Sequence, residues 1–253
     1  MTTINWDFPR LKQLYKGTIG RWKTLGIPKI RPRILRIIPH DSKAFTQGLV
    51  YYAGVLYEST GLVNCSSLRE NSLDTGKINR IVAVEDVWCE GIAIFKGRLF
   101  QLTYESCVVL IYSLPELKKV GELKYEGEGW GMTSNSQFLI MSNGSNLLYF
   151  RDENFKVVKI LPVFLKGRAL DGINDIQCVQ DKIYANIFFG TDIFEIDLGS
   201  GLVNRIIDCS EIIIRSNRKS FKQVLNGIAY CEKSKTFLLT GKFWPYLFEV
   251  KIP

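Results

Sequence analysis

Hydrophobic residues occur in short runs along this chain, and a three-residue motif precedes each run. The motif is a polar or aromatic residue, then glycine (aspartate in one copy), then a large apolar residue. Its copies are Gln47-Gly48-Leu49, Glu90-Gly91-Ile92, Trp130-Gly131-Met132, Asn174-Asp175-Ile176 and Asn226-Gly227-Ile228. Their first residues are 43, 40, 44 and 52 positions apart. A repeat of about 40–50 residues is typical of propellers and solenoids.

The apolar runs are rich in β-branched and aromatic residues, with turn residues between them, and therefore predict strands. They are Val55-Leu56-Tyr57, Leu99-Phe100-Gln101-Leu102, Phe138-Leu139-Ile140-Met141, Ile183-Tyr184-Ala185 and Phe237-Leu238-Leu239. Five such units predict an all-β fold, a five-bladed β-propeller. A further strand, 34–38, precedes the first unit, and the last unit ends at 248–252. We expect this N-terminal strand to complete the last blade and close the ring, which removes sheet edges.

Residues 31–253 are predicted to form the propeller, a single catalytic domain. The blades are expected at about 45–82, 88–121, 127–161, 172–208 and from about 224 onward. The polar segment 209–223 predicts a helix or loop beside the mouth of the channel. Residues 1–30 form a basic extension, in which Leu11, Leu14, Tyr15 and Ile19 fit one face of a short helix.

The composition is typical of a globular protein and limits which kinds of binding partner we expect. The chain has 253 residues, of which 46% are hydrophobic, and no apolar run reaches the ~18 residues of a membrane span. The net charge is +8, and residues 1–36 contain nine basic residues against the single acid Asp7. A basic segment of this kind is a solvated extension or a weak, salt-sensitive polyanion contact, so we expect no nucleic-acid partner and no membrane insertion. No signal peptide is visible, which predicts a cytoplasmic protein unless a signal has been removed.

Cysteine and histidine usage argues against a metal centre. The six cysteines form no CxxC pair, and His40 is the single histidine, so we expect neither a zinc site nor another cofactor. No GxSxG motif and no glycine-rich phosphate loop occur. We expect His40 to have a structural role in a turn, and Glu58 and Arg69 to form an ion pair within the first blade.

Equivalent positions of a propeller lie around one axis, so the repeat predicts which side chains meet. The residues before the glycine form one ring: Gln47, Glu90, Trp130, Asn174 and Asn226. A second ring follows 13–16 residues later: Thr60, Tyr104, Asn143, Phe188 and Lys242. Together they describe a cup with aromatic walls, one carboxylate, one amine and several amides, which is the composition of a site for a small molecule or a peptide terminus.

Glu90 is the only carboxylate in the first ring, with Trp88 and Trp130 near it in the sequence. Burial would raise its pKa and suit it to proton transfer, although a structural pairing with Lys242 or a backbone amide fits the spacing as well. Lys242 lies in an apolar stretch, and lysine is seldom buried without a function. For Asp175, in a glycine position, a structural role is favoured.

Several motifs in one order resemble the plant-type and bacterial glutaminyl-peptide cyclotransferases (glutaminyl cyclases). They are Pro39-His40-Asp41, Phe45-Thr46-Gln47-Gly48-Leu49, Tyr57-Glu58-Ser59-Thr60-Gly61, Glu90-Gly91-Ile92, Glu128-Gly129-Trp130-Gly131, Asn226-Gly227-Ile228-Ala229 and Thr240-Gly241-Lys242-Phe243-Trp244-Pro245. The resemblance covers about residues 38–252. It implies a five-bladed propeller that converts an N-terminal glutamine of peptides or proteins into pyroglutamate, releasing ammonia without a catalytic metal.

The resemblance also implies roles for individual residues. It places the catalytic glutamate at Glu90, with Lys242, Asn174 and Gln47 as further catalytic groups. It assigns substrate binding to Phe45, Trp88, Tyr104, Trp130, Phe188 and Asn226. The chain departs from the family pattern at Tyr104 and Phe188, where the family has tryptophan, at Asp175, where it has glutamate, and at Asn143, where it has aspartate. These departures leave a second hypothesis open, a monomeric propeller that binds a peptide N-terminus or small amide with weak or no turnover.

Overall fold

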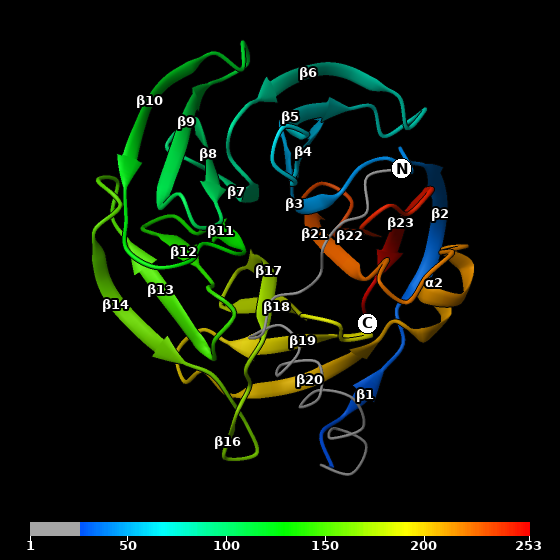
Figure 1. The fold of residues 1–253 in the computed structure, drawn as a ribbon. Coiled ribbons are helices and arrows are strands. Elements are labelled where there is room, and N and C mark those ends of the chain that lie inside the picture. Colours follow the sequence, from blue (N-terminus) through cyan, green and yellow to red (C-terminus); the bar gives the residue numbers. More distant parts are fainter. Residues whose placement is uncertain (1–25) are drawn as a thin grey trace.

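The structure is a computed structural model that describes residues 26–253, and these residues form a ring of sheets around a central axis (Figure 1). Within them, five sheets contain four or five strands each, and each sheet runs from an innermost strand at the axis to an outermost strand at the rim. The predicted all-β, five-bladed propeller is therefore confirmed.

The first three blades consist of antiparallel strands in chain order. Blade one contains β3 (Thr46–Tyr52), β4 (Val55–Thr60), β5 (Ser66–Asn71) and β6 (Ile78–Val84). Blade two contains β7 (Cys89–Phe95), β8 (Arg98–Thr103), β9 (Val108–Ser113) and β10 (Lys119–Lys124). Blade three contains β11 (Met132–Ser134), β12 (Leu139–Met141), β13 (Leu147–Arg151) and β14 (Val157–Pro162). A small hairpin follows it, formed by β15 (Phe164–Leu165) and β16 (Arg168–Ala169).

Blade four has an additional strand from the N-terminal segment. Its own strands are β17 (Ile173–Val179), β18 (Lys182–Ile187), β19 (Asp192–Asp197) and β20 (Val203–Asp208). β1 (Lys29–Ile30) pairs in parallel with β20, and it comes from the segment that the sequence analysis placed in the basic extension. The helix predicted around Leu11–Ile19 lies outside the described residues.

The last blade closes the ring as predicted. It contains β21 (Leu225–Cys231), β22 (Thr236–Gly241) and β23 (Tyr246–Lys251). β2 (Arg33–Pro39) runs antiparallel to β23, in a register from Arg33 opposite Lys251 to Pro39 opposite Tyr246. Strands from the two ends of the described chain thus lie side by side at the rim of one sheet (Figure 1).

Burial of apolar side chains between the blades holds the ring together. Among the described residues, five hydrophobic clusters fill the five seams between neighbouring blades. The largest lies between blades three and four and includes Phe150, Ile176 and Phe194. Each blade depends on both neighbours for this burial, because one sheet alone leaves its faces exposed to water.

The glycine of the repeated motif is required where innermost strands approach each other. β3, β7, β11, β17 and β21 contact one another in sequence around the axis. A Cβ atom on Gly91 would lie 2.4 Å from the backbone nitrogen of Met132, and one on Gly131 would lie 2.0 Å from the carbonyl oxygen of Asn174. Only glycine allows backbones to approach so closely.

The segment between blades four and five contacts the turn that contains Lys242. It contains the short helix α2 (Ser210–Arg215). At its end, the Gln223 carbonyl accepts a hydrogen bond of 2.8 Å from Trp244 Nε1. The next carbonyl, of Val224, accepts one of 2.9 Å from the Lys242 amide. The segment thereby fixes the turn after β22 that contains Lys242.

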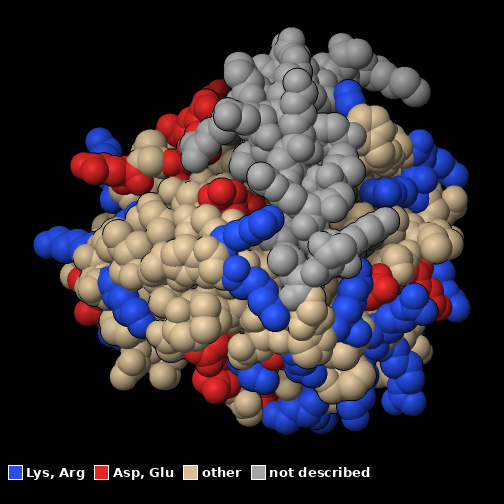
Figure 2. All heavy atoms as spheres, turned by 90° about the horizontal axis from the view of Figure 1, so that it is seen from below, with Lys and Arg blue, Asp and Glu red and all other residues tan. Residues whose placement is uncertain are grey.

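The described surface carries mixed charge. Figure 2 shows Lys and Arg side chains over the lower and right-hand parts of one face, with acidic side chains among them. Across residues 26–253, no helix has the length and apolar character needed to cross a membrane.

Candidate active site

The first predicted ring is built by β-bulges at the axis. The register between innermost and second strands shifts at Gln47 in blade one, Glu90 in blade two, Asn174 in blade four and Asn226 in blade five. A bulge leaves its residue unpaired in the ladder and turns the side chain out of the regular alternation. In these four blades the repeated motif is thus the sequence of the bulge, which takes one polar side chain out of the strand pairing. In blade three Trp130 precedes β11, and the β11–β12 pairing has no register shift.

Three of these bulge residues, Gln47, Glu90 and Asn226, contact each other across the blades. Gln47 Nε2 donates a hydrogen bond of 2.6 Å to Glu90 Oε1. Asn226 Nδ2 donates to the Thr46 carbonyl at 2.9 Å and lies 3.5 Å from Gln47 Oε1. Since blades five, one and two are joined in this order, Glu90 is held by an amide that is itself oriented by a neighbour.

Glu90 and Lys242 are buried together, with exposed fractions of 5% and 3%. Burial raises the pKa of Glu90 well above its ordinary value, and the charge of Lys242 opposes this rise. Burial lowers the pKa of Lys242 to about 8, against the charges of Glu90 and Asp175, which raise it. Burial thus favours the neutral form of both groups, and pKa values perturbed in this way are typical of proton-transfer sites.

The Lys242 ammonium lies against the aromatic wall. Its Nζ is 4.4 Å from the centre of the Phe45 ring and 5.9 Å from that of Phe188. A cation over the face of an aromatic ring is stabilised by the ring's negative face, so the rings hold the amine in place without removing its donors. Two residues predicted to bind substrate thus meet the predicted catalytic amine.

The remaining predicted wall residues form edge-to-face or tilted pairs. Phe45 contacts Trp88 at a centroid distance of 5.5 Å, and Trp88 contacts Tyr104 at 6.1 Å. Trp130 contacts Phe188 at 5.5 Å. Trp88 and Tyr104 are only partly buried whereas Phe45, Trp130 and Phe188 are buried, which places the open side of the cup at Trp88 and Tyr104.

Only three of the five residues of the second predicted ring take part in the wall of the cup. The structure brings Tyr104, Phe188 and Lys242 into the aromatic contacts described above. Thr60 instead shares a hydrogen bond of 2.6 Å with Ser67 in its own blade. Asn143 Oδ1 accepts hydrogen bonds from the amide and hydroxyl of Ser145, which closes a local turn. The side chains of Thr60 and Asn143 thus make local contacts.

Three residues near the cup were missed or given a different emphasis in the sequence analysis. Phe243 packs against Phe45 at 5.2 Å, and Glu128 accepts a hydrogen bond of 3.0 Å from Trp130 Nε1. Both belong to motifs that contain a predicted site residue, and that proximity was the available signal. Asp175, for which a structural role was favoured, is fully buried and acts electrostatically on both Glu90 and Lys242.

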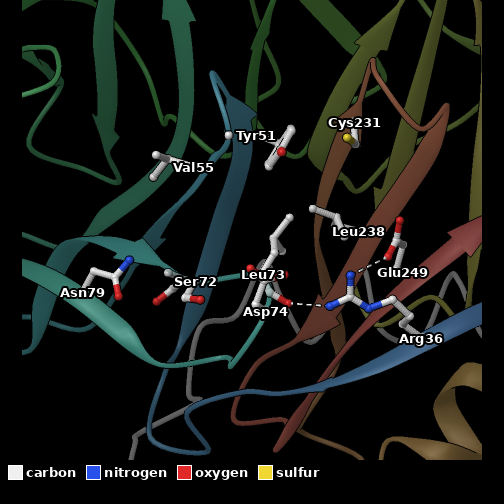
Figure 3. A pocket seen from close by; sticks show the side chains of 12 residues that line it. Arg36, Tyr51, Val55, Ser72, Leu73, Asp74, Asn79, Cys231, Leu238 and Glu249 are labelled. Atoms are coloured by element: carbon white, nitrogen blue, oxygen red, sulfur yellow. Dashed lines mark hydrogen bonds and ion pairs between the residues drawn. The ribbon is translucent and has the colours of Figure 1, made fainter.

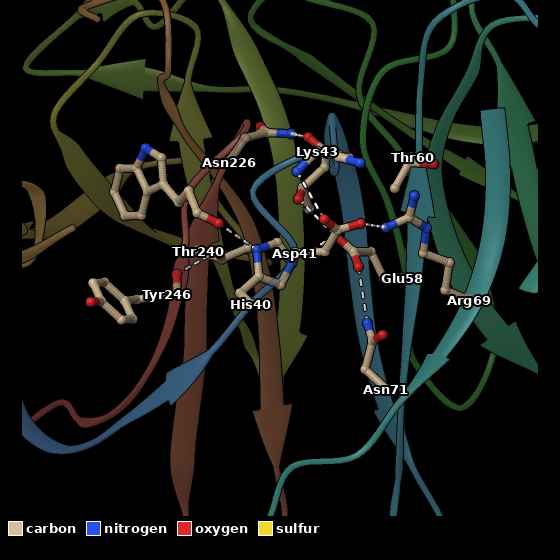
Figure 4. Close-up of polar contacts among 12 residues, drawn as sticks. His40, Asp41, Lys43, Glu58, Thr60, Arg69, Asn71, Asn226, Thr240 and Tyr246 are labelled. Atoms are coloured by element: carbon tan, nitrogen blue, oxygen red, sulfur yellow. Dashed lines mark hydrogen bonds and ion pairs between the residues drawn. The ribbon is translucent and has the colours of Figure 1, made fainter. Parts of the chain in front are cut away.

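A polar network around Glu58 shows that the expected ion pair between Glu58 and Arg69 is wrong (Figure 4). Glu58 and Arg69 face each other in register, but the Arg69 guanidinium pairs with Asp41 at 3.0 Å. Glu58 accepts hydrogen bonds from His40 at 3.0 Å, from Thr46 at 2.7 Å and from Asn71 at 2.9 Å. Buried Glu58 is satisfied by these three side chains, and Arg69 instead pairs with Asp41 and donates a hydrogen bond of 2.8 Å to Ser67.

His40 has the structural role that was expected. Its Nδ1 lies 2.8 Å from the Trp244 carbonyl oxygen, and its Nε2 lies 3.0 Å from Glu58. Both partners are acceptors, so the arrangement favours the doubly protonated ring. Burial lowers the pKa of His40, but the charge and hydrogen bond of Glu58 outweigh burial and raise it overall.

A separate cavity of about 330 Å³ lies between blades one and five (Figure 3). It is lined by Tyr51 near the end of β3, whereas Gln47 lies near the beginning of that strand. Arg36 lies 3.5 Å from Glu249 and donates a hydrogen bond of 2.8 Å to the Leu73 carbonyl, so its charge is compensated within the wall. We assign no ligand to this cavity. Within residues 26–253, no group of three His, Cys, Asp or Glu side chains could hold a metal ion.

Comparison with known proteins gives a consistent result. The sequence model of the glutamine cyclotransferase family matches residues 14–252. A glutaminyl-peptide cyclotransferase of Arabidopsis thaliana is 32% identical over 221 residues, which is 85% of this chain and 69% of the relative. The crystal structure of Myxococcus xanthus glutaminyl cyclase superposes with a TM-score of 0.85 at 34% identity, covering 89% of this chain and 97% of that structure.

Proposed function

The chain belongs to the glutamine cyclotransferase family, and from this premise we propose that it converts the N-terminal glutamine of peptides and proteins into pyroglutamate with release of ammonia. The enzyme is an acyltransferase whose family acts on peptides. One observation carries the finer proposal: a buried carboxyl, Glu90, lies in an aromatic cup beside a buried amine, Lys242, and a hydrogen-bonded amide, Gln47.

The reaction is an internal acyl transfer. The α-amine nitrogen of the substrate forms a bond to the carbon of its own side-chain carboxamide, and the bond from that carbon to the amide nitrogen breaks. The proton lost by the attacking nitrogen leaves with the departing nitrogen as ammonia, so atoms and electrons balance without an oxidant or reductant. The chemistry therefore requires one group that accepts a proton and returns it.

Glu90 is the group suited to both proton steps. Burial raises its pKa above that of an exposed glutamate, and a raised pKa suits a carboxyl group that must both accept and donate a proton. Ionised Glu90 accepts the proton from the attacking amine, and the resulting acid donates it to the leaving nitrogen. The hydrogen bond from Gln47 holds the carboxyl oriented for this work.

Charge developing on the carboxamide oxygen needs donors that are already in place. Lys242 supplies an ammonium fixed over Phe45, and Asn174 and Gln47 supply amide donors from the bulges of two other blades. Such preorganised donors stabilise an oxyanion more than water does, because they need no reorganisation during the reaction. Asn226 supports this set by contacting Gln47.

The aromatic residues support a substrate that is a chain end. The rings of Phe45, Trp88, Tyr104, Trp130 and Phe188 pack against one another as the wall of the proposed cup. Such a wall would favour the folded glutamine side chain with amine and carboxamide close together. The cup is built from residues of one chain, and we propose that the enzyme acts as a monomer. No proposed step requires a metal ion.

The test is ammonia release from a Gln-initiated peptide at about pH 8, where much of the N-terminal amine is neutral. We expect turnover that persists in a strong chelator and falls about 10³-fold in Glu90→Gln, because the amide can accept no proton. The matched control is Glu116→Gln, at an exposed position of blade two. Sedimentation velocity on the same sample reports the oligomeric state.

Three results would contradict parts of this proposal. A well-folded wild-type protein that binds Gln-peptides without releasing ammonia would contradict the proposal in favour of a peptide-binding propeller. A Glu90→Gln variant with normal turnover would contradict the role of Glu90. A large loss of thermal stability in that variant would instead indicate a structural glutamate.

A further inference from the structure

The cluster at the axis contains more acid than base. Among the described residues, two carboxyl groups, Glu90 and Asp175, act on one amine, Lys242, and none of the three is more than 5% exposed. One ammonium compensates one carboxylate. A second uncompensated negative charge would be costly in a site removed from water, so the free cluster retains a proton on one carboxyl.

Asp175 occupies an unusual position in the repeat. The other four units have glycine there, whereas blade four places a carboxyl group on the bulge of its innermost strand. Asp175 Oδ2 accepts a hydrogen bond of 2.8 Å from the Ile228 amide of blade five. Oδ1 is buried and has no hydrogen-bond partner among the described residues. The backbone amides of Ile176 and Leu49 also stabilise the charged carboxyl group, so Asp175 has structural contacts and in addition brings a second acid into the cluster.

We propose that Asp175 is a positioning residue for the reaction: its carboxyl group controls how readily Glu90 holds a proton, and so sets the pH range in which Glu90 accepts one from the substrate amine. The inference rests on the proposed function, since it assigns Asp175 a task only through Glu90. Asp175 itself does not touch the reacting atoms; it acts through the low-dielectric interior that it shares with Glu90 and Lys242.

The electrostatic effects of the neighbouring groups on the pKa of Glu90 have the signs that this role requires. The charge of Asp175 raises the pKa of Glu90, whereas that of Lys242 lowers it. Burial raises the pKa of Asp175 itself to about 8, with backbone amides, first that of Ile228, acting against it. Glu128, in the loop before β11, adds a further negative charge that acts on Glu90. Glu90 thus lies between two carboxyl groups that favour its protonated form and one amine that favours its ionised form.

The first experiment is the pH dependence of kcat/KM in Asp175→Asn. Asparagine keeps the shape and an oxygen for the Ile228 amide but removes the charge. We expect the acidic limb, which reports ionisation of Glu90, to move about one unit toward lower pH, as for strongly interacting groups. Asp175→Glu restores the charge and should restore the wild-type limb. Asp192→Asn, which removes a blade-four carboxylate paired with Lys29, is the control and should leave the limb unchanged.

A second readout does not depend on turnover. Infrared titration of the ligand-free protein follows the carbonyl band of protonated buried carboxyl groups, and loss of one step in Glu90→Gln assigns that step to Glu90. In Asp175→Asn the Glu90 step should move to lower pH. An unmoved step in a folded variant, with an unmoved kinetic limb, would overturn the inference. A moved step in a protein that releases no ammonia would support the coupling while contradicting the proposed function.

Discussion

At the scale of single residues, Lys242 shows how opposing effects set a charge. Burial disfavours its ammonium, and the carboxyl groups of Glu90 and Asp175 favour it. The Phe45 ring 4.4 Å away adds an attraction for the charged form. The outcome is a pKa of about 8, so near neutral pH the amine is still mostly charged and able to stabilise an oxyanion.

Replacing this amine should affect both rate and pH dependence. We expect Lys242→Met to lower kcat about 10²-fold, since a preorganised donor is lost. Lys242 lowers the pKa of Glu90, so its removal raises that pKa and moves the acidic limb of kcat/KM toward higher pH, opposite to Asp175→Asn. Steady-state kinetics against pH provide the check, with Lys233→Met on the exposed surface as control. A limb that moves downward would refute the assigned electrostatics.

At the scale of elements, the innermost strands of four blades combine close packing with a bulge. The bulge presents a polar side chain to the axis, and the glycine after it lets the neighbouring strand pass. In blade two the polar side chain is that of Glu90 and the glycine is Gly91, so the proposed catalytic group and the packing contact are adjacent in the chain.

Adding one methyl group at this contact should therefore be costly. In Gly91→Ala the new Cβ would lie 2.4 Å from the Met132 backbone nitrogen, so two strands must separate. We expect a loss of about 3 kcal/mol in the free energy of unfolding, measured by denaturant titration. Gly121→Ala in β10 is the matched control, because its Cβ would meet nothing within 4 Å. Equal stability of the two variants would show that the close approach is not required.

At the scale of the whole molecule, the ring is closed where β2 pairs with the C-terminal strand β23. β2 completes blade five, and the next residues cross to blade one through His40, which bridges the Trp244 carbonyl and Glu58. Thr46, which donates to Glu58, also precedes Gln47. Hydrogen bonds from His40 through Glu58 to Thr46 therefore link the closure of the ring to the bulge that contains Gln47.

This bridge should make stability depend on pH. The raised pKa of His40 contributes stability that is complete below about 6.5 and is lost as the pH rises through the folded value. The pKa of Glu58 is lowered to about 2, which contributes stability above about 4.5 that is lost as the pH falls toward 2. Wild type should exceed His40→Gln by about 2 kcal/mol between about pH 4.5 and 6.5, and by less at higher pH. Thermal unfolding across this range tests it; a difference that grows above pH 7 would contradict the bridge.

Much of this arrangement could be predicted because a propeller repeats. The spacing of Gln47, Glu90, Asn174 and Asn226 predicted that they would meet, and bulges at equivalent positions bring Gln47, Glu90 and Asn226 into contact. Side-chain contacts that do not follow from the repeat could not be predicted. Arg69 could pair with either Glu58 or Asp41 within reach, and the competing hydrogen bonds of His40 and Asn71 decided the matter.

The sequence by itself determined the number of blades, the strand that closes the ring and the polar residues that face the axis, because alternation and repeat length are local properties of a chain. Only the tertiary structure decided their chemistry. Burial depth and the electrostatic interactions among Glu90, Lys242 and Asp175 arise from packing five blades together. A pKa depends on that packed environment, and for this reason the role of Asp175 became visible only in the folded molecule.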